Sequence, residues 1–221
     1  MSKIEGAAPI VVFDLDGVLI DSAEANVQAF RFGLEKAGVK GTDSEAILSL
    51  VGYPADEMLR RLGCPEDDVE RTFQEHVRPF YIENLPSLAR AYPGARRVLE
   101  ELKASGFQIA ACTSGDRATQ TTALKSIDLW DCIEEMQTPD DSEFRKPEIR
   151  YLQEVLERFE EHGDVHHVED SEVGLEMGLN CGATTYFASY GNGSLTGKVK
   201  PHTTLKSIRE LPRAILRTLA R

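Results

Sequence analysis

The sequence predicts an α/β fold, in which a parallel sheet lies between helices and a run of helices interrupts the chain. Short apolar, β-branched segments alternate with segments of helical periodicity, a pattern typical of parallel sheets. Residues 22–88 carry helical patterns and no strand signal, so they predict an inserted group of helices. Polar residues follow several of the predicted strands, where open parallel sheets bind their ligands.

The first predicted strand, Ile10–Phe13, is β-branched and aromatic and too short for a helix, which favours a strand buried on both faces. Asp14 and Asp16 follow it two residues apart, and the period of a strand would aim both carboxylates the same way. Because the two negative charges repel, a divalent cation such as Mg²⁺ is the expected counter-charge. Gly17 allows a sharp turn directly after the acids.

The insertion shows helical spacing of apolar residues in four stretches. We expect helices at 23–37, 45–51 and 55–62, and a fourth from residue 65 to about residue 80. The sequence therefore predicts a small helical cap of residues 22–88 on a core made of residues 1–21 and 89–221.

Helices and strands alternate again after the insertion. We expect helices at 95–104, 116–127, 147–161 and 174–179, and strands at 107–112, 132–136, 165–168 and 184–188. The loop 190–200 holds three glycines and is expected to be mobile. His166 and His167 lie in a strand, whose neighbouring side chains face opposite ways, so we interpret both as structural.

Polar residues that can carry chemistry stand at the predicted strand ends. Thr113 follows the second strand, Lys146 precedes the helix after the third, and Glu169 with Asp170 follows the fourth. Each of them taken alone has an ordinary explanation, such as a helix cap or a solvated loop lysine. Their order along the chain, behind Asp14 and Asp16, gives them weight as a set.

The run from Asp14 to Ser22, Asp-Leu-Asp-Gly-Val-Leu-Ile-Asp-Ser, resembles the first motif of the haloacid dehalogenase-like phosphatases. The segments at Thr113, Lys146 and Glu169-Asp170 resemble the other three motifs of that family, in the same order. The resemblance covers nearly the whole chain and implies a Rossmann-like core with a helical cap. It also implies a small phosphorylated metabolite as substrate and Mg²⁺ as cofactor.

The resemblance assigns a role to each of these residues. Asp14 would attack phosphorus to give an aspartyl-phosphate, and Asp16 would act as general acid and then as general base. Asp16 would meet the metal through its backbone carbonyl, which leaves its carboxyl group free. The metal ligands implied by the family are Asp14, Asp16, Glu169 and Asp170.

The phosphate group would be held by the segment after the second strand. Thr113 and the amide of Ser114, together with Gly115, would bind phosphate oxygens, and Lys146 would neutralise Asp14 and the phosphoryl group. Arg60 in the cap is a candidate contact for a substrate carboxylate or hydroxyl group.

Three other functions are weighed against a phosphatase. The fourth motif lacks a later aspartate and resembles the β-phosphoglucomutase branch, but those mutases carry a histidine where this chain has Asn26. The loop around Tyr53-Pro54 and the Tyr92-Pro93-Gly94 segment look more like phosphoglycolate-phosphatase-type hydrolases. Dehalogenases of the family lack an equivalent of Asp16, and phosphoacceptor signalling domains are shorter and have no helical insertion.

The composition of this 221-residue chain indicates which classes of partner to expect. Its net charge of −12 argues against nucleic acid or an anionic membrane as partner. The four cysteines are scattered, which favours reduced thiols in a cytoplasm, with Cys112 and Cys132 buried. We expect no signal peptide in the first nine residues and no bilayer-spanning stretch. The oligomeric state is not indicated.

Overall fold

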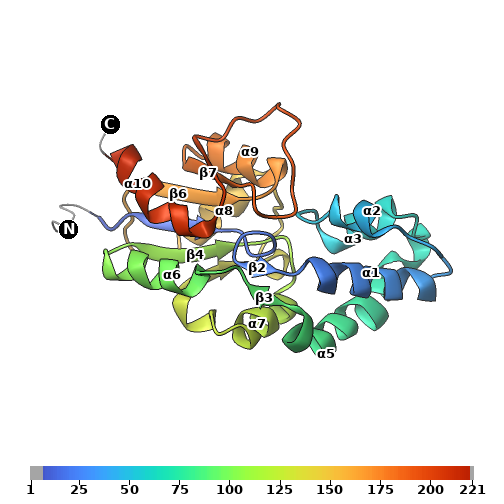
Figure 1. Ribbon diagram of the computed structural model, residues 1–221. Helices are drawn as coiled ribbons and strands as arrows, with labels where there is room; N and C mark the ends of the chain where they lie inside the picture. The colour runs from blue at the N-terminus through green and yellow to red at the C-terminus, as the bar shows by residue number, and fades with distance from the viewer. Residues whose placement is uncertain (1–6, 220–221) are drawn as a thin grey trace.

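A six-stranded parallel sheet forms the centre of the computed structural model, which describes residues 7–219 (Figure 1). The strand order is β5–β4–β1–β6–β7–β8, so β1 is a central strand. The strands are β1 (Ile10–Phe13), β4 (Gln108–Cys112), β5 (Glu135–Gln137), β6 (Val165–Glu169), β7 (Thr184–Ala188) and β8 (Thr203–Leu205). The predicted α/β fold with a parallel sheet is confirmed.

Alternate residues of β1 enter two separate hydrophobic clusters, as the two-residue period of a strand requires. Val11 and Phe13 face the cluster that contains apolar residues of α6, α7 and α10, whereas Ile10 and Val12 face α8 and α9. These helices are α6 (Ala95–Ala104), α7 (Arg117–Ser126), α8 (Ile149–Leu156), α9 (Glu172–Asn180) and α10 (Leu211–Leu219). All four residues of β1 are fully buried, which explains its unbroken apolar sequence.

The inserted helices lie to one side of the sheet, on the right of Figure 1. They are α1 (Ala23–Lys36), α2 (Ser44–Leu48), α3 (Ala55–Arg61), α4 (Val69–Thr72) and α5 (Arg78–Leu88), with a 3₁₀ turn at Glu66–Asp68 and a π-helical turn at Phe73–Val77. The chain leaves the core through β2 (Ile20–Asp21) and returns through β3 (Arg90–Ala91), and these two strands pair as a short antiparallel ribbon. The helical insertion is confirmed, whereas the domain boundaries at residues 22 and 88 stay a prediction.

Two predicted core elements differ from those observed. The strand expected at 132–136 begins only at Glu135, because Trp130–Cys132 forms a 3₁₀ turn that Arg96 of α6 ties down through Asp131 at 2.9 Å. The helix expected to reach residue 161 ends at Leu156, and Arg158 instead donates to the backbone oxygen of Met136 in β5. At each of these two boundaries, an arginine contacts a neighbouring element: Arg96 at the start of β5 and Arg158 at the end of α8.

Several further features bear on the expectations from sequence. β8 and α10 were not anticipated, and both lie beyond the last predicted strand. The four thiols are free, with Cys112 and Cys132 buried as expected. Within residues 7–219, no helix combines the length and the apolar character needed to cross a bilayer. The expectation about a signal peptide falls largely on residues 1–6, which lie outside the described part of the chain.

His166 in β6 predicts a pH dependence of stability. Its ring is buried within hydrogen-bonding distance (3.0 Å) of the Tyr186 hydroxyl, and burial lowers the pKa of His166 to about 4. The unfolded chain binds this proton near pH 6.5, so its stabilising contribution is complete above pH 6.5 and is lost as the pH falls towards 4. At pH 5 the loss should be about 2 kcal/mol.

Urea unfolding at pH 7.5 and pH 5 measures this loss, and His166→Gln removes the titrating group while keeping a hydrogen-bonding partner for Tyr186. We expect the variant to lose about 2 kcal/mol less than the wild type between these two pH values. Equal losses in both proteins would exclude His166 as the source.

Candidate active site

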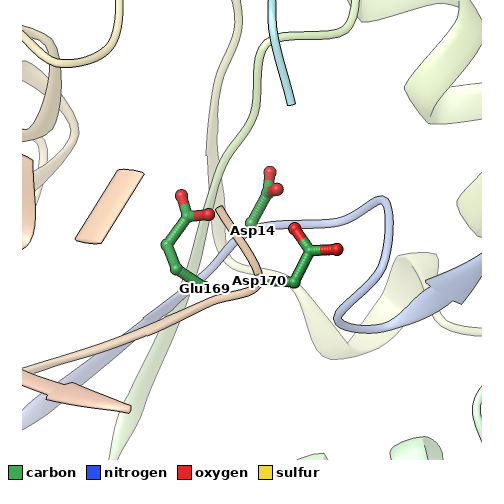
Figure 2. A group of neighbouring side chains, drawn as sticks. All are labelled: Asp14, Glu169 and Asp170. Atoms are coloured by element: carbon green, nitrogen blue, oxygen red, sulfur yellow. The ribbon is translucent and has the colours of Figure 1, made fainter. Parts of the chain in front are cut away.

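Three carboxylates meet at the carboxyl ends of two neighbouring strands. Asp14 directly follows β1, and its backbone amide donates to Val168 of β6 at 2.9 Å, which extends the parallel pairing by one residue. Glu169 ends β6, and Asp170 comes next. One carboxylate oxygen from each of the three acids lies within 4.8 Å of the others, and all three side chains are buried (Figure 2). The topology therefore places them together, as strand-end positions predict.

Lys146 is the cation that the structure brings to this acidic cluster (Asp14, Glu169 and Asp170). Its Nζ lies 3.1 Å from Oδ1 of Asp14 and forms a second ion pair with Glu169, and the lysine side chain is fully buried. The residue comes from the loop before α8. One ammonium group thus faces three carboxylates, which leaves the cluster with an excess of negative charge.

The excess charge perturbs the acids strongly. Burial and the neighbouring Glu169 raise the pKa of Asp14 to about 7, although Lys146 partly offsets both effects. Burial also raises the pKa of Asp170 well above its usual range, with the charge of Asp14 adding to the effect. Both shifts report that the cluster needs further positive charge to hold all its carboxylates ionised.

The geometry of Asp170 fits a bound cation. Its Oδ2 accepts hydrogen bonds from the backbone amides of Asn192 and Gly193, at 2.9 and 3.1 Å, which fix the side chain. Its Oδ1 is buried and has no hydrogen-bonding partner among the described residues. An oriented, unpartnered oxygen beside two further carboxylates is a donor set of the kind that Mg²⁺ prefers.

Gly17 is required by the same cluster. Its φ of +78° lies in the left-handed region, and a Cβ at this position would come within 1.9 Å of Oδ2 of Asp170. The turn after β1 thus lies directly against the acidic cluster, and only a residue without a side chain fits there.

Asp16 is not a member of the acidic cluster and is held by its own set of hydrogen bonds. Ser22 donates to Oδ1 of Asp16, and Gln120 of α7 donates to Oδ2 at 2.7 Å. Asn26 donates to the Ser22 hydroxyl at 3.0 Å and accepts from the hydroxyl of Tyr81 in α5. A hydrogen-bond chain therefore runs from the inserted helices to the carboxyl group of Asp16.

The segment Thr113–Gly115 extends β4 in the same way as Asp14 extends β1. The amide of Thr113 donates to Gln137 of β5 at 3.1 Å, and its side-chain oxygen accepts from the amide of Gly115 at 3.2 Å. The hydroxyl of Ser114 donates to the backbone oxygen of Gly52 at 2.9 Å, which links the core to the insertion. The predicted segment therefore lies where core and cap meet.

A cavity of about 60 Å³ lies between this segment and the inserted helices. Asp14, Asp16 and Thr113 form part of its wall from the core side, and Met58 and Phe73 contribute from the insertion. Ser114 and Gly115 line it as well. The structure thus places the candidate nucleophile, the candidate acid and the candidate phosphate-binding segment around one cavity.

Arg60 lies outside this cavity. It pairs with Asp56 at 2.6 Å and with Glu66 at 3.0 Å, and all three side chains are exposed. It lines an adjoining surface hollow between the insertion and the core, which shares Ser114 and Asp116 with the cavity. A substrate contact by Arg60 stays a prediction that the geometry does not favour.

The sequence pattern that defines the haloacid dehalogenase-like hydrolases matches residues 11–188 of the chain. The chain belongs to this family. Two similar proteins are phosphoglycolate phosphatases, one from Mesorhizobium japonicum, 26% identical with 83% of each chain covered, and one from Nitrosospira multiformis, 29% identical with 82% and 83% covered. A solved structure described as a predicted phosphoglycolate phosphatase from Haemophilus somnus superposes with a TM-score of 0.86 at 20% identity, over 96% of this chain and all of the other.

The family and the similar phosphatases agree on the class of reaction. This haloacid dehalogenase-like hydrolase is an enzyme of the phosphoric monoester hydrolase class, and the resemblance stated from the four motifs is confirmed. Sequence reasoning missed Gln120 and Tyr81, whose contacts to Asp16 and Asn26 span 104 and 55 residues. No local pattern marks either residue.

Gly17→Ala in this hydrolase should destabilise the fold more than Gly38→Ala. Both glycines have positive φ, but a Cβ at Gly38 meets nothing within 4 Å, whereas at Gly17 it collides with Asp170. We expect Gly38→Ala to cost about 1 kcal/mol from backbone strain and Gly17→Ala to cost about 3 kcal/mol or more. Chemical unfolding of both variants measures the difference, and equal costs would show that the contact with Asp170 has no energetic effect.

Proposed function

We propose that this hydrolase is a Mg²⁺-dependent phosphatase that removes phosphate from a small phosphomonoester through an aspartyl-phosphate on Asp14. The proposal rests mainly on the different environments of two nearby acids, Asp14 and Asp16. Asp14 lies in the acidic cluster beside Lys146, and Asp16 is held outside it by Ser22 and Gln120. These two environments support a nucleophilic role for Asp14 and a proton-transfer role for Asp16.

Asp14, Glu169 and Asp170, with the backbone carbonyl of Asp16, would hold Mg²⁺. When bound, the ion supplies positive charge that lets a carboxylate approach an anionic phosphate. The unpartnered Oδ1 of Asp170 and the raised pKa of Asp14 support this assignment.

The chain's own residues account for the proposed bond changes. A carboxylate oxygen of Asp14 forms a bond to phosphorus while the bond from phosphorus to the leaving oxygen breaks, and Asp16 gives its proton to that oxygen. Water then attacks phosphorus, Asp16 takes the proton of that water, and phosphate leaves with Asp14 restored. Throughout, Lys146 neutralises Asp14 and the phosphoryl oxygens, which Thr113 and the amide of Ser114 also bind.

The mutase alternative has less support. Both ends of the Asn26 amide are engaged, with Ser22 and with Tyr81, where the mutases carry a histidine. An amide held in this way has no proton to give at neutral pH. A hydrolase, which transfers the phosphoryl group to water, fits this arrangement better than a mutase, which transfers it to a sugar.

The remaining assignments concern substrate and location. Phosphoglycolate-like compounds and sugar phosphates are the candidate classes, since two relatives bear the name phosphoglycolate phosphatase. We propose a cytoplasmic enzyme without nucleic-acid or membrane partners, on the basis of the net charge of −12 and the free thiols.

Asp14→Asn should reduce phosphate release by at least about a thousandfold, because an amide is a poor nucleophile towards phosphorus. Asp67→Asn changes an exposed carboxylate by the same chemistry and should leave the rate unchanged. A malachite-green assay with para-nitrophenyl phosphate and sugar phosphates measures the rates, and circular dichroism checks the fold. Substantial activity in Asp14→Asn would remove it as the nucleophile.

EDTA should abolish phosphate release, and added Mg²⁺ should restore it, because the cluster holds more negative charge than Lys146 offsets. Asp170→Asn should raise the Mg²⁺ concentration needed for half-maximal rate at least about tenfold. Titration of Mg²⁺ into the metal-free proteins provides the measurement. Full activity in EDTA would contradict the proposed metal site.

A further inference from the structure

The cavity beside Asp14 has no positively charged side chain among the described residues of its wall. Among the described residues that line it, Asp14, Asp16 and Asp116 are acidic, and none is Lys, Arg or His. The side formed by the insertion is largely apolar, with Phe30 and Met58 among its residues. A substrate that fills this cavity meets carboxylates at one end and neutral groups elsewhere.

Two cations close to residues of the cavity wall are already paired with carboxylates. Lys146 binds Asp14 and Glu169 in the acidic cluster, and Arg78 of α5 binds Asp116 at 3.1 Å. The proposed Mg²⁺ and Lys146 together supply three positive charges, which balance the three carboxylates of the cluster. The phosphate of the substrate adds two negative charges, so the cluster has no positive charge left for a second anionic group of the substrate.

A neutral partner for the substrate is available instead. Gln120 lines the cavity, is only 3% exposed, and donates its amide hydrogen to Asp16. Its Oε1 is buried and has no hydrogen-bonding partner among the described residues. A hydroxyl group of the substrate would satisfy this oxygen, whereas a carboxylate would be repelled by it.

We infer that the leaving group of the substrate is a small uncharged alcohol that carries a second hydroxyl group, and that Gln120 binds this hydroxyl. The inference rests on the proposed phosphatase activity and narrows its substrate class to phosphates of small polyols. It departs from 2-phosphoglycolate, whose carboxylate would enter a cavity with no cation to receive it.

Two nearly isosteric substrates test the inference in the wild-type enzyme with Mg²⁺. 2-Hydroxyethyl phosphate and 2-phosphoglycolate differ only in a CH₂OH group in place of a carboxylate. We expect kcat/KM for the hydroxyethyl ester to be at least about tenfold higher, since the carboxylate loses its hydration without gaining a partner. Equal values, or a preference for 2-phosphoglycolate, would overturn the inference and leave the phosphatase proposal standing. Release from neither ester nor from para-nitrophenyl phosphate would overturn both.

Ethyl phosphate differs from 2-hydroxyethyl phosphate only in lacking the hydroxyl group, so a comparison of the two esters measures the effect of that group. The wild type should prefer 2-hydroxyethyl phosphate over ethyl phosphate by about tenfold in kcat/KM. Gln120→Leu also removes a hydrogen bond to Asp16, so its overall rate will fall, but the ratio between the two esters is independent of that loss. The ratio should drop to near one in Gln120→Leu, and an unchanged ratio would exclude Gln120 as the hydroxyl's partner.

Met58→Lys adds the cation that the cavity lacks. Met58 lies on the cap side of the wall, and Met58→Leu is the matched control that keeps it neutral. We expect Met58→Lys to shift the ratio of kcat/KM values at least about tenfold towards 2-phosphoglycolate, and Met58→Leu to leave it unchanged. A folded Met58→Lys enzyme with the wild-type ratio would show that charge on the wall does not set the preference.

Discussion

The burial of three carboxylates around one ammonium group is the constraint on which the site depends. β1 and β6 are neighbouring parallel strands buried on both faces, so the residues that follow them are forced together and shielded from water. Asp14, Glu169 and Asp170 occupy those positions, and Lys146 offsets only part of their charge. Such a cluster is costly in an empty protein and becomes favourable when a divalent cation binds. The fold thus concentrates negative charge at this point, which supports the metal site proposed above.

The inserted helices contribute no acidic residue to this cluster, yet they are tied to the chemistry in another way. Tyr81 reaches Asn26, Asn26 reaches Ser22, and Ser22 reaches Asp16. The carboxyl group of Asp16 is therefore oriented partly by α1 and α5. A movement of the insertion relative to the core would disturb this chain and with it the orientation of Asp16.

The residues at the strand ends could be predicted from sequence because neighbouring residues in the chain define them. An apolar run that ends in Asp14-Leu15-Asp16-Gly17 predicts both the buried strand and the acidic turn, and the order of the later motifs predicts which residues join it. The boundary of α8 was wrong because Arg158 is drawn to β5, a contact that no window of neighbouring residues contains. Gln120 was missed for the same reason, since only the folded chain brings it to Asp16.

Reaction chemistry and substrate choice come from different parts of this molecule. The charges that would act on phosphate stand at the ends of central strands, where a change of residue alters the cluster as a whole. The rest of the cavity is built from the insertion and α7, which lie outside that charge balance. With the proposed Mg²⁺ bound, the cluster and its counter-charges would balance among themselves, and under our inference the rest of the wall would select the leaving group. Met58 can therefore change without a direct effect on the strand ends, whereas Gln120 links the wall to Asp16.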